Sequence, residues 1–194
     1  AALRAARSSS RNAVIAWRED SRNVLTRSTK TGSYFLNDLD TATSTAVTTI
    51  IQSAGFPAPP TEKEILIDPN NPDTLVLIQR LSIEIRNAKT GERALVINST
   101  SSLIASAVSR DTIAWITFDQ KKSASLLYLY DRASGVRQND SSVVQGKTIK
   151  LTWVDSDRLG ILQNDGELFM YTRSNNGVSH LASDVRDFAW DTDN

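Results

Sequence analysis

His180 is the single histidine of the chain, and the sequence contains no cysteine. A general base needs a nucleophile and an orienting acid close to it in space. The pattern VSHLA around His180 supplies no such arrangement, so we expect this histidine on a surface or edge strand. With one histidine and no cysteine, zinc and other transition-metal sites are not expected.

Two acidic stretches have the alternate-carboxylate spacing of a calcium loop. They are Asp155-Ser-Asp157 and Asp191-Thr-Asp193-Asn194. Gly160 stands at the sixth position of the first stretch, as in an EF-hand loop, but the bidentate Glu expected at position twelve is missing. Asp and Asn side chains also bond to the backbone two residues further on. We therefore interpret both stretches as turns.

The remaining candidate sites are short motifs that arise easily in a Ser/Thr-rich chain. They are two glycosylation sequons and two acidic pairs: Asn98-Ser-Thr100, Asn139-Asp-Ser141, Asp38/Asp40 and Asp184/Asp187. Neither pair has a feature that marks it as a glycosidase dyad. The sequence has no Gly-rich phosphate loop, nucleophile elbow or HExxH motif. We expect no catalytic residue, no bound metal and no cofactor.

The elements that would position these residues are strands. Short runs of Val, Ile, Leu and aromatic residues alternate with stretches of Asp, Asn, Ser, Thr and Gly, as in strands and turns. Only AALRAAR at the N-terminus resembles a helix. Hydrophobic residues make up 40% of the chain and charged residues 23%, as in globular proteins. These features predict an all-β protein.

Four hairpins repeat along the chain. They are YFLNDLDTATSTAVTTI from Tyr34, LSIEIRNAKTGERALVI from Leu81, LLYLYDRASGVRQ from Leu126 and LFMYTRSNNGVSHLA from Leu168. The aligned turn residues are Ser44, Gly91, Gly135 and Gly177, at intervals of about 47, 44 and 42 residues. This is the period of four-stranded propeller blades. Glycine suits a hairpin turn that needs a positive φ, so the turn at Ser44 is predicted to be looser or of another type.

A strand, an acidic or Asn-rich turn and a second strand precede each hairpin. These units begin at Val14, Glu64, Ile104 and Ile149, and VRDFAWDTDN begins another at Val185. The Pro-rich stretch Ser53–Lys63 reads as a semi-rigid insertion. The predicted organisation is an N-terminal stalk or linker over 1–12, blades over about 13–52, 64–98, 103–145 and 148–183, and a segment over 184–194 that starts or closes a blade.

The repeated order of strand, Asp-rich turn, strand and hairpin closing on Asp-x-x-x-Gly resembles TolB-like and WD-like β-propeller repeats. The corresponding turns here read REDSRN, DPNNPD, SRDT and DSDR. None contains the full Ser-Pro-Asp-Gly of that family, and a WD dipeptide occurs only at Trp190-Asp191. The resemblance covers nearly the whole chain from Ala13 and implies a β-propeller or a piece of one, since known propellers of this kind have six or seven blades.

Four tryptophans fit this architecture. Trp17, Trp153 and Trp190 fall at or near the end of the first strand of a unit, and Trp115 falls on a second strand. Large aromatic side chains bury much apolar surface, so we expect them to wedge neighbouring blades together. Exposed recognition aromatics are the alternative.

The charge balance limits the choice of partner. Lys and Arg number 22, as do Asp and Glu, which favours neither nucleic acid nor an anionic membrane. No apolar run reaches the roughly twenty residues of a membrane span. Residue 1 is Ala, so we expect a piece cut from a longer or anchored precursor.

We therefore expect a non-enzymatic protein-interaction module from an extracytoplasmic, bacterial envelope or surface protein, although a cytoplasmic location stays open. One alternative is an enzyme or carbohydrate-binding propeller with a site at the central channel. Another is a structural spacer that self-associates through exposed strand edges.

Overall fold

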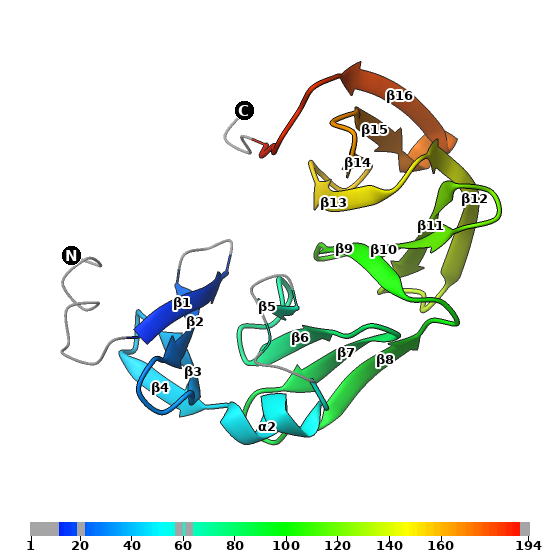
Figure 1. Cartoon of the computed structure of the whole chain (residues 1–194). Helices are drawn as coiled ribbons and strands as arrows, with labels where there is room; N and C mark the ends of the chain where they lie inside the picture. The colour runs from blue at the N-terminus through cyan, green and yellow to red at the C-terminus, as the bar shows by residue number, and fades with distance from the viewer. Residues whose placement is uncertain (1–11, 19–21, 57–59, 61–63, 191–194) are drawn as a thin grey trace. The chain divides into compact units, whose positions relative to one another are not determined.

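The computed structural model describes residues 12–18, 22–56, 60 and 64–190, except the side chains of 139–143. The N-terminal stretch AALRAAR lies outside these residues. The strands form four separate four-stranded antiparallel sheets, and each sheet is one continuous stretch of chain (Figure 1). The predicted all-β fold of four-stranded antiparallel sheets is confirmed.

The chain divides into two compact units, residues 1–98 and 99–194. The first unit contains sheets A and B. Sheet A is β1 (Asn12–Trp17), β2 (Asn23–Ser28), β3 (Tyr34–Asp38) and β4 (Thr43–Ala46); sheet B is β5 (Ile65–Ile67), β6 (Thr74–Ile78), β7 (Ser82–Asn87) and β8 (Arg93–Asn98). In each sheet the strands lie side by side in chain order.

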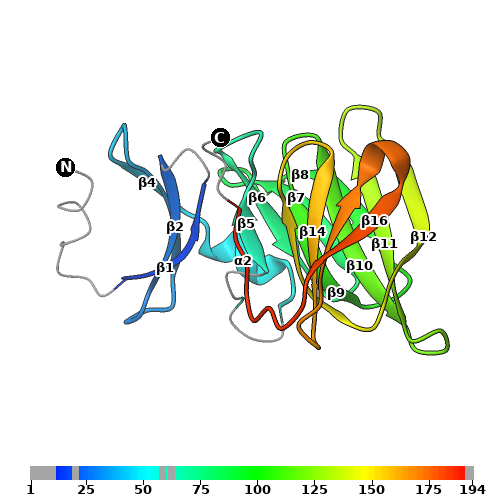
Figure 2. The ribbon, with the colours of Figure 1, turned by 90° about the horizontal axis from the view of Figure 1, so that it is seen from above.

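The second unit contains sheets C and D. Sheet C is β9 (Leu103–Val108), β10 (Thr112–Asp119), β11 (Ala124–Asp131) and β12 (Arg137–Gln145); sheet D is β13 (Thr148–Trp153), β14 (Arg158–Gln163), β15 (Leu168–Thr172) and β16 (Gly177–Ala182). The short 3-10 helix η1 (Arg173–Asn175) precedes β16. Seen from above, the long strands β10, β11 and β12 lie side by side (Figure 2).

Each unit has one apolar core between the facing sides of its two sheets. In the first unit, Leu25 and Leu36 of sheet A meet Leu75 and Leu77 of sheet B. In the second, Ile116 and Leu127 of sheet C meet Leu159 and Ile161 of sheet D. Alternate residues along each strand point to opposite faces, so every sheet of a pair also has an outer face. Trp17 lies on the outer face of sheet A, and Gly160 lies on the outer face of sheet D.

The hairpin turns follow the predicted chemistry with two corrections. Gly91 and Gly135 have φ of 75° and 72°, as their alignment predicts. In the first hairpin Ser44 lies inside β4, and the residue with positive φ is Ala42, at 53°. In the fourth, Asn176 takes the positive φ, at 51°, and Gly177 begins β16. Asn tolerates this conformation better than most residues, so the alignment placed the turn one residue late.

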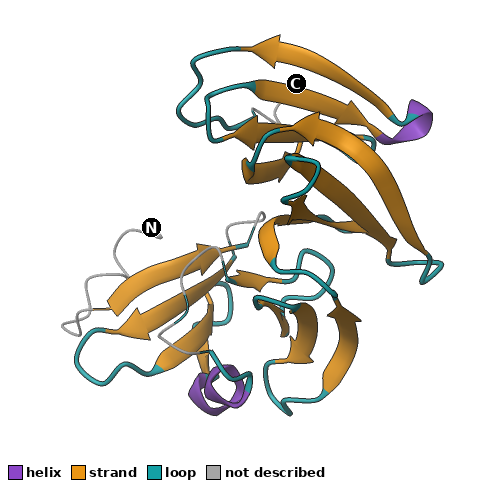
Figure 3. Cartoon of the chain, turned by 45° about the vertical axis from the view of Figure 1, so that its right-hand side comes forward, coloured by secondary structure: helices purple, strands orange, loops and turns teal. Residues whose placement is uncertain are grey.

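A short helix, α2 (Thr48–Ser53), follows sheet A where the sequence suggested the end of a strand and the start of an insertion (Figure 3). The run Thr-Thr-Ile-Ile has β-branched side chains, which favour strands. Burial overrides that preference, because Val47 and Ile51 are 0% and 1% exposed in the core of the first unit. Residues 57–59 and 61–63 of the predicted insertion lie outside the described residues.

The unit predicted to restart at Val185 forms no strand in the described residues 183–190. Sheet D ends at Ala182, and the backbone N–H of Val185 donates a hydrogen bond to the carbonyl of Gly166 at 2.9 Å. The chain then runs along sheet D, with Phe188 and Trp190 against Gly160. Residues 191–194, with Asp191 and Asp193, lie outside the described part.

Candidate functional site

His180 lies on edge strand β16, as predicted, and is exposed. Its Nε2 is 2.5 Å from Oε2 of Glu167, and the Ser183 hydroxyl lies 3.4 Å from the same nitrogen. Ser183 donates to Glu167 Oε2 at 3.0 Å. In a catalytic triad the acid and the nucleophile contact opposite ring nitrogens. Here both face one nitrogen, so the trio cannot work as a nucleophile relay in this geometry.

Asp155 stabilises the turn between β13 and β14, and Asp157 of the same turn binds η1. Oδ1 of Asp155 accepts hydrogen bonds from the backbone N–H groups of Asp157 and Arg158, at 2.9 and 2.7 Å. Partial burial would raise the pKa of Asp155, but these hydrogen bonds and the Arg158 guanidinium lower it overall. Asp157 accepts hydrogen bonds from the backbone and hydroxyl of Ser174. Turn chemistry therefore occupies both carboxylates.

Residues of the two acidic pairs also have structural partners. Asp38 Oδ1 accepts from the N–H groups of Asp40 and Thr41, and the Thr41 hydrogen bond is the main cause that lowers the pKa of Asp38. Asp187 pairs with Lys150, whose Nζ is 2.5 Å from Asp187 Oδ1. Within the described residues no group of three or more His, Asp or Glu side chains is arranged to hold a metal ion.

The tryptophans divide between core and surface. Trp115 is 0% exposed and stacks on Tyr128, with ring centroids 5.4 Å apart. Trp153 packs against the core of the second unit and donates from Nε1 to the carbonyl of Ala107 at 3.3 Å. Trp17, however, is 56% exposed. The expectation that every tryptophan wedges two sheets together is wrong for Trp17.

Trp17 belongs to an apolar patch on the outer face of sheet A. It lies opposite Val24 in the ladder, and Val14 lies opposite Thr26, which in turn pairs with Phe35. Val14 is 49% exposed. The neighbouring Ala16 and Leu25 point the other way, into the core. Val14 and Trp17 are three residues apart, and the β-bulge between Val14 and Ala16 brings both of these exposed apolar side chains onto one face of β1.

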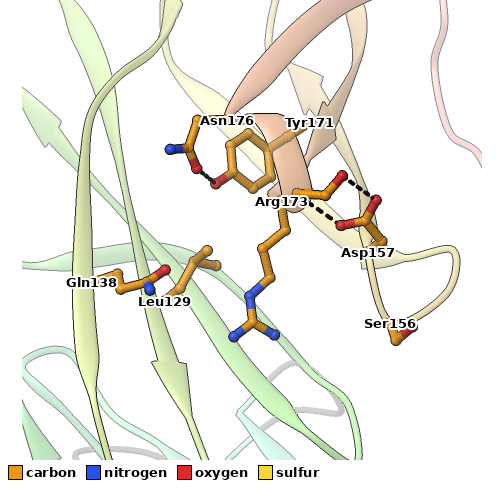
Figure 4. Close-up of a pocket in the computed structure, with 8 residues that line it drawn as sticks. Leu129, Gln138, Ser156, Asp157, Tyr171, Arg173 and Asn176 are labelled. Atoms are coloured by element: carbon orange, nitrogen blue, oxygen red, sulfur yellow. Dashed lines mark hydrogen bonds between the residues drawn. The ribbon is translucent and has the colours of Figure 1, made fainter.

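A polar cavity of about 750 Å³ lies between sheets C and D. Its lining comes from β11 and β12, the β13–β14 turn, the end of β15 and η1: Leu129, Gln138, Ser156, Asp157, Tyr171, Arg173, Ser174 and Asn176 (Figure 4). The Tyr171 hydroxyl donates to Asn176 Oδ1 at 3.0 Å. Amide, hydroxyl, carboxylate and guanidinium groups thus line the cavity, and the ring of Tyr171 is buried beneath them.

Arg173 connects the two sheets at this cavity. Its Nη2 donates to Asp131 Oδ2 at 2.8 Å, and its Nη1 donates to the Thr112 hydroxyl at 3.0 Å. The pKa of Asp131 is lowered by the backbone hydrogen bond from Ser134, then by Arg173 and the Ser134 hydroxyl. Because both outer nitrogens of the guanidinium are engaged, Arg173 fixes the cavity wall.

Sequence reasoning did not find this cavity. Arg173, Gln138 and Tyr171 come from separate repeats, and none has a spacing that marks it. The Ser-Asn-Asn run before Gly177 was the one sequence feature that could have indicated a polar turn beside the cavity. Asn176, the last residue of this run, has a positive φ. Of the sequons, Asn98 is exposed at the end of β8, and the side chain of Asn139 lies outside the description.

No helix among the described residues is long and apolar enough to cross a membrane.

Comparison with known proteins shows the fold alone. No protein-family model matches the sequence, and no curated protein matches it. Among solved structures, the chain is similar to PorZ, an essential bacterial surface component of the type-IX secretion system of Porphyromonas gingivalis. The TM-score is 0.61 at 12% identity, over 89% of this chain and 22% of PorZ.

A second similar structure is an oligogalacturonate lyase in complex with manganese. The TM-score is 0.59 at 11% identity, over 87% of this chain and 51% of the lyase. The chain therefore spans about a quarter and a half of the lengths of these two proteins. The chain is an all-β protein of four four-stranded antiparallel sheets, which are β-propeller blades as in these similar structures.

Proposed function

We propose that this chain is a non-enzymatic protein-interaction module of a bacterial envelope or surface protein, and that the outer face of sheet A contacts its protein partner. The observation that carries the proposal is the exposure of Trp17 and Val14 together on β1. Tryptophan is enriched at the centres of protein interfaces, where its burial contributes much of the binding free energy.

Three further observations support this proposal. PorZ, a bacterial surface component, has a similar arrangement of sheets. The period of the repeats and the carboxylate-stabilised turns also support membership of the TolB-like group of propellers. The even charge of the chain offers no competing attraction for nucleic acid.

The test compares variants of two exposed apolar patches. The Trp17→Ser/Val14→Ser chain changes the outer face of sheet A, and Val178→Ser/Leu181→Ser is a matched control, because these residues of β16 are 38% and 46% exposed. Each immobilised chain is incubated with an envelope extract of the source organism. We expect the unmodified chain and the control to retain a partner protein that the sheet A variant does not retain. Equal retention by all three, or saturable turnover by the purified chain, contradicts the proposal.

A second candidate function is carbohydrate binding at the cavity between sheets C and D. Gln138 and Asn176 offer amide groups there, and such groups suit sugar hydroxyls. A similar fold occurs in a protein that acts on oligogalacturonate. Titration calorimetry with oligogalacturonates and with neutral oligosaccharides of equal length tests this candidate. Heat of binding that Gln138→Ala removes and exposed Gln120→Ala keeps supports it; no heat with any sugar rejects it.

A further inference from the structure

The outer face of sheet D has a binding site for two aromatic rings, formed around Gly160 and Lys150 and called the seat below. Leu159 and Ile161 of β14 point into the core of the second unit, so Gly160 between them points to the outer face. A Cβ atom on Gly160 would lie 2.7 Å from Cε2 of Phe188 and 2.9 Å from Cζ2 of Trp190. Gly160 has no positive φ that would require glycine. Its missing side chain therefore serves the close approach of the two rings.

A cation completes the seat. Lys150 lies opposite Leu162 in the ladder, on the same outer face. Its Nζ is 2.5 Å from Oδ1 of Asp187, donates to the carbonyl of Phe188 at 2.5 Å and lies 4.9 Å from the centre of the Phe188 ring. Lys150 thus contacts the carboxylate of Asp187 and both the carbonyl and the aromatic ring of Phe188.

The rings are held by shape and aromatic contact. Phe188 and Trp190 meet edge to face, with centroids 5.5 Å apart. Nε1 of Trp190 is buried and has no hydrogen-bond partner among the described residues. Residues 183–190 form no strand, so the seat holds this segment through its side chains and not through a ladder of backbone hydrogen bonds.

The segment has a natural point of attachment before the rings. Asp184 has a φ of +60°, a conformation that costs energy in a non-glycine residue. The N–H of Val185 then binds the carbonyl of Gly166. A strained residue followed by a single backbone bond makes a hinge from which residues 187–190 can detach without unravelling sheet D.

We propose that the outer face of sheet D is a docking surface for a peptide segment of acidic–aromatic–any–aromatic sequence, which the chain itself occupies with Asp187–Trp190. A partner segment of the same chemistry replaces this internal ligand. The apparent affinity of the partner therefore rises with the fraction of molecules in which the internal segment 187–190 has left the surface. This proposal concerns sheet D and is independent of the contact proposed for sheet A.

The test is direct binding of a fluorescein-labelled peptide with the sequence of residues 184–190. The receptor is the Phe188→Ala/Trp190→Ala chain, in which the rings of the internal ligand are gone. An attached ligand competes at millimolar effective concentration, so we expect the peptide to bind the double variant at least tenfold more tightly than the unmodified chain. A peptide with both aromatic residues replaced by Ala is the matched control and should not bind.

Two receptor changes show that the seat is the binding site. Gly160→Val added to the double variant fills the space of the rings, and Lys150→Gln removes the cation. We expect the first to abolish peptide binding and the second to weaken it at least tenfold. Equal affinity of the peptide for the unmodified chain and the double variant, no binding to either, or binding unaffected by Gly160→Val overturns the proposal.

Circular dichroism of the double variant completes the experiment. An unfolded double variant would show that the two rings are a fixed part of the core and not a replaceable ligand, and this also overturns the proposal. A folded variant whose amides in β14 exchange hydrogen faster than in the unmodified chain, and are protected again by the peptide, supports it.

Discussion

Arg173 of η1 reaches from sheet D to sheet C, where its Nη2 lies 2.8 Å from Oδ2 of Asp131. The same guanidinium binds the hydroxyl of Thr112, which is 1% exposed. The two sheets share an apolar core, but this contact is polar and lies at the edge of that core beside the cavity. It fixes the position of η1 against sheet C and so determines the shape of the cavity wall.

Replacing Arg173 with Gln should destabilise the second unit. The buried Thr112 hydroxyl loses its partner, and an unsatisfied buried hydroxyl costs about 1–3 kcal/mol. Arg158→Gln is the matched control, because the Arg158–Asp155 pair is exposed and lies within one turn, and such pairs contribute little. Urea unfolding of both variants measures the difference. A larger loss from Arg158→Gln than from Arg173→Gln would contradict this role.

Asp131 should make the stability of the chain depend on pH in the acid range. Its hydrogen bonds from Ser134 and Arg173 lower its pKa in the folded protein below the ordinary value of 3.8. A carboxyl with a lowered pKa stabilises the fold above its unfolded-state pKa, and this contribution is lost as the pH falls through the folded-state pKa. Melting temperatures measured from pH 6 downward should therefore show a gap between the unmodified chain and Asp131→Asn that narrows below about pH 4.

The repeat of strands and turns could be predicted because each step is local. Strand alternation and turn chemistry depend on neighbouring residues, and Asn87 and Asp131 accept the backbone hydrogen bonds that the Asp-x-x-x-Gly pattern indicates. The fourth hairpin has Thr172 at this place. There the carboxylate comes from Asp157, on the preceding turn, which binds the backbone and hydroxyl of Ser174. A carboxylate or amide oxygen thus accepts the backbone hydrogen bond in each of these turns, but in the fourth hairpin it comes from a different position in the sequence.

The cavity and the ring seat could not be predicted, because both join residues that are far apart in the sequence. Arg173 and Asp131 come from different repeats, with no charge pattern that pairs them. Gly160 fitted a calcium loop by spacing, yet its function depends on Phe188 and Trp190 folding back over it. Only the packed structure shows that a glycine inside a strand makes room for a neighbour.

The first hairpin can be stabilised by the glycine that the second and third hairpins have at the position of positive φ. Ala42 has a φ of 53°, where an L-residue with a Cβ costs roughly 1–2 kcal/mol and glycine nearly nothing. Ala42→Gly should therefore raise the melting temperature. Gly91→Ala, at a φ of 75° and with a Cβ 3.5 Å from Ile50, should lower it. Differential scanning calorimetry of both variants checks the opposite signs, and shifts of the same sign would exclude this explanation.

Trp115 and Trp17 should respond differently to truncation. Trp115 is fully buried beside Tyr128, and its ring also lies 4.9 Å from the Arg137 guanidinium. Trp115→Ala should cost about 3–5 kcal/mol of unfolding free energy, as for other buried aromatic side chains. Trp17→Ala should change stability by less than about 0.5 kcal/mol, because exposed positions contribute little. Chemical denaturation measures both values, and a large loss at Trp17 would mark it as structural instead of an interface residue.

A buried ion pair in sheet B allows the last prediction. Glu84 and Arg86 are 7% and 4% exposed, and Arg86 Nε donates to Glu84 Oε2 at 2.7 Å. Arg86 Nη1 also donates to the Ser53 hydroxyl at the end of α2, at 2.9 Å, so the pair attaches this helix to the sheet.

Removing Glu84 leaves the Arg86 charge buried without its carboxylate, and removing Arg86 leaves Glu84 with only the exposed Arg93, whose Nε lies 3.5 Å from Glu84 Oε2. Glu84→Met or Arg86→Met alone should each cost about 3–5 kcal/mol. The double variant places two apolar side chains in the same space, so its loss should be well below the sum of the single losses. A double-mutant cycle by urea unfolding gives this coupling. Strictly additive losses would show that the two side chains act independently, and that α2 is held by Val47 and Ile51 and not by the ion pair.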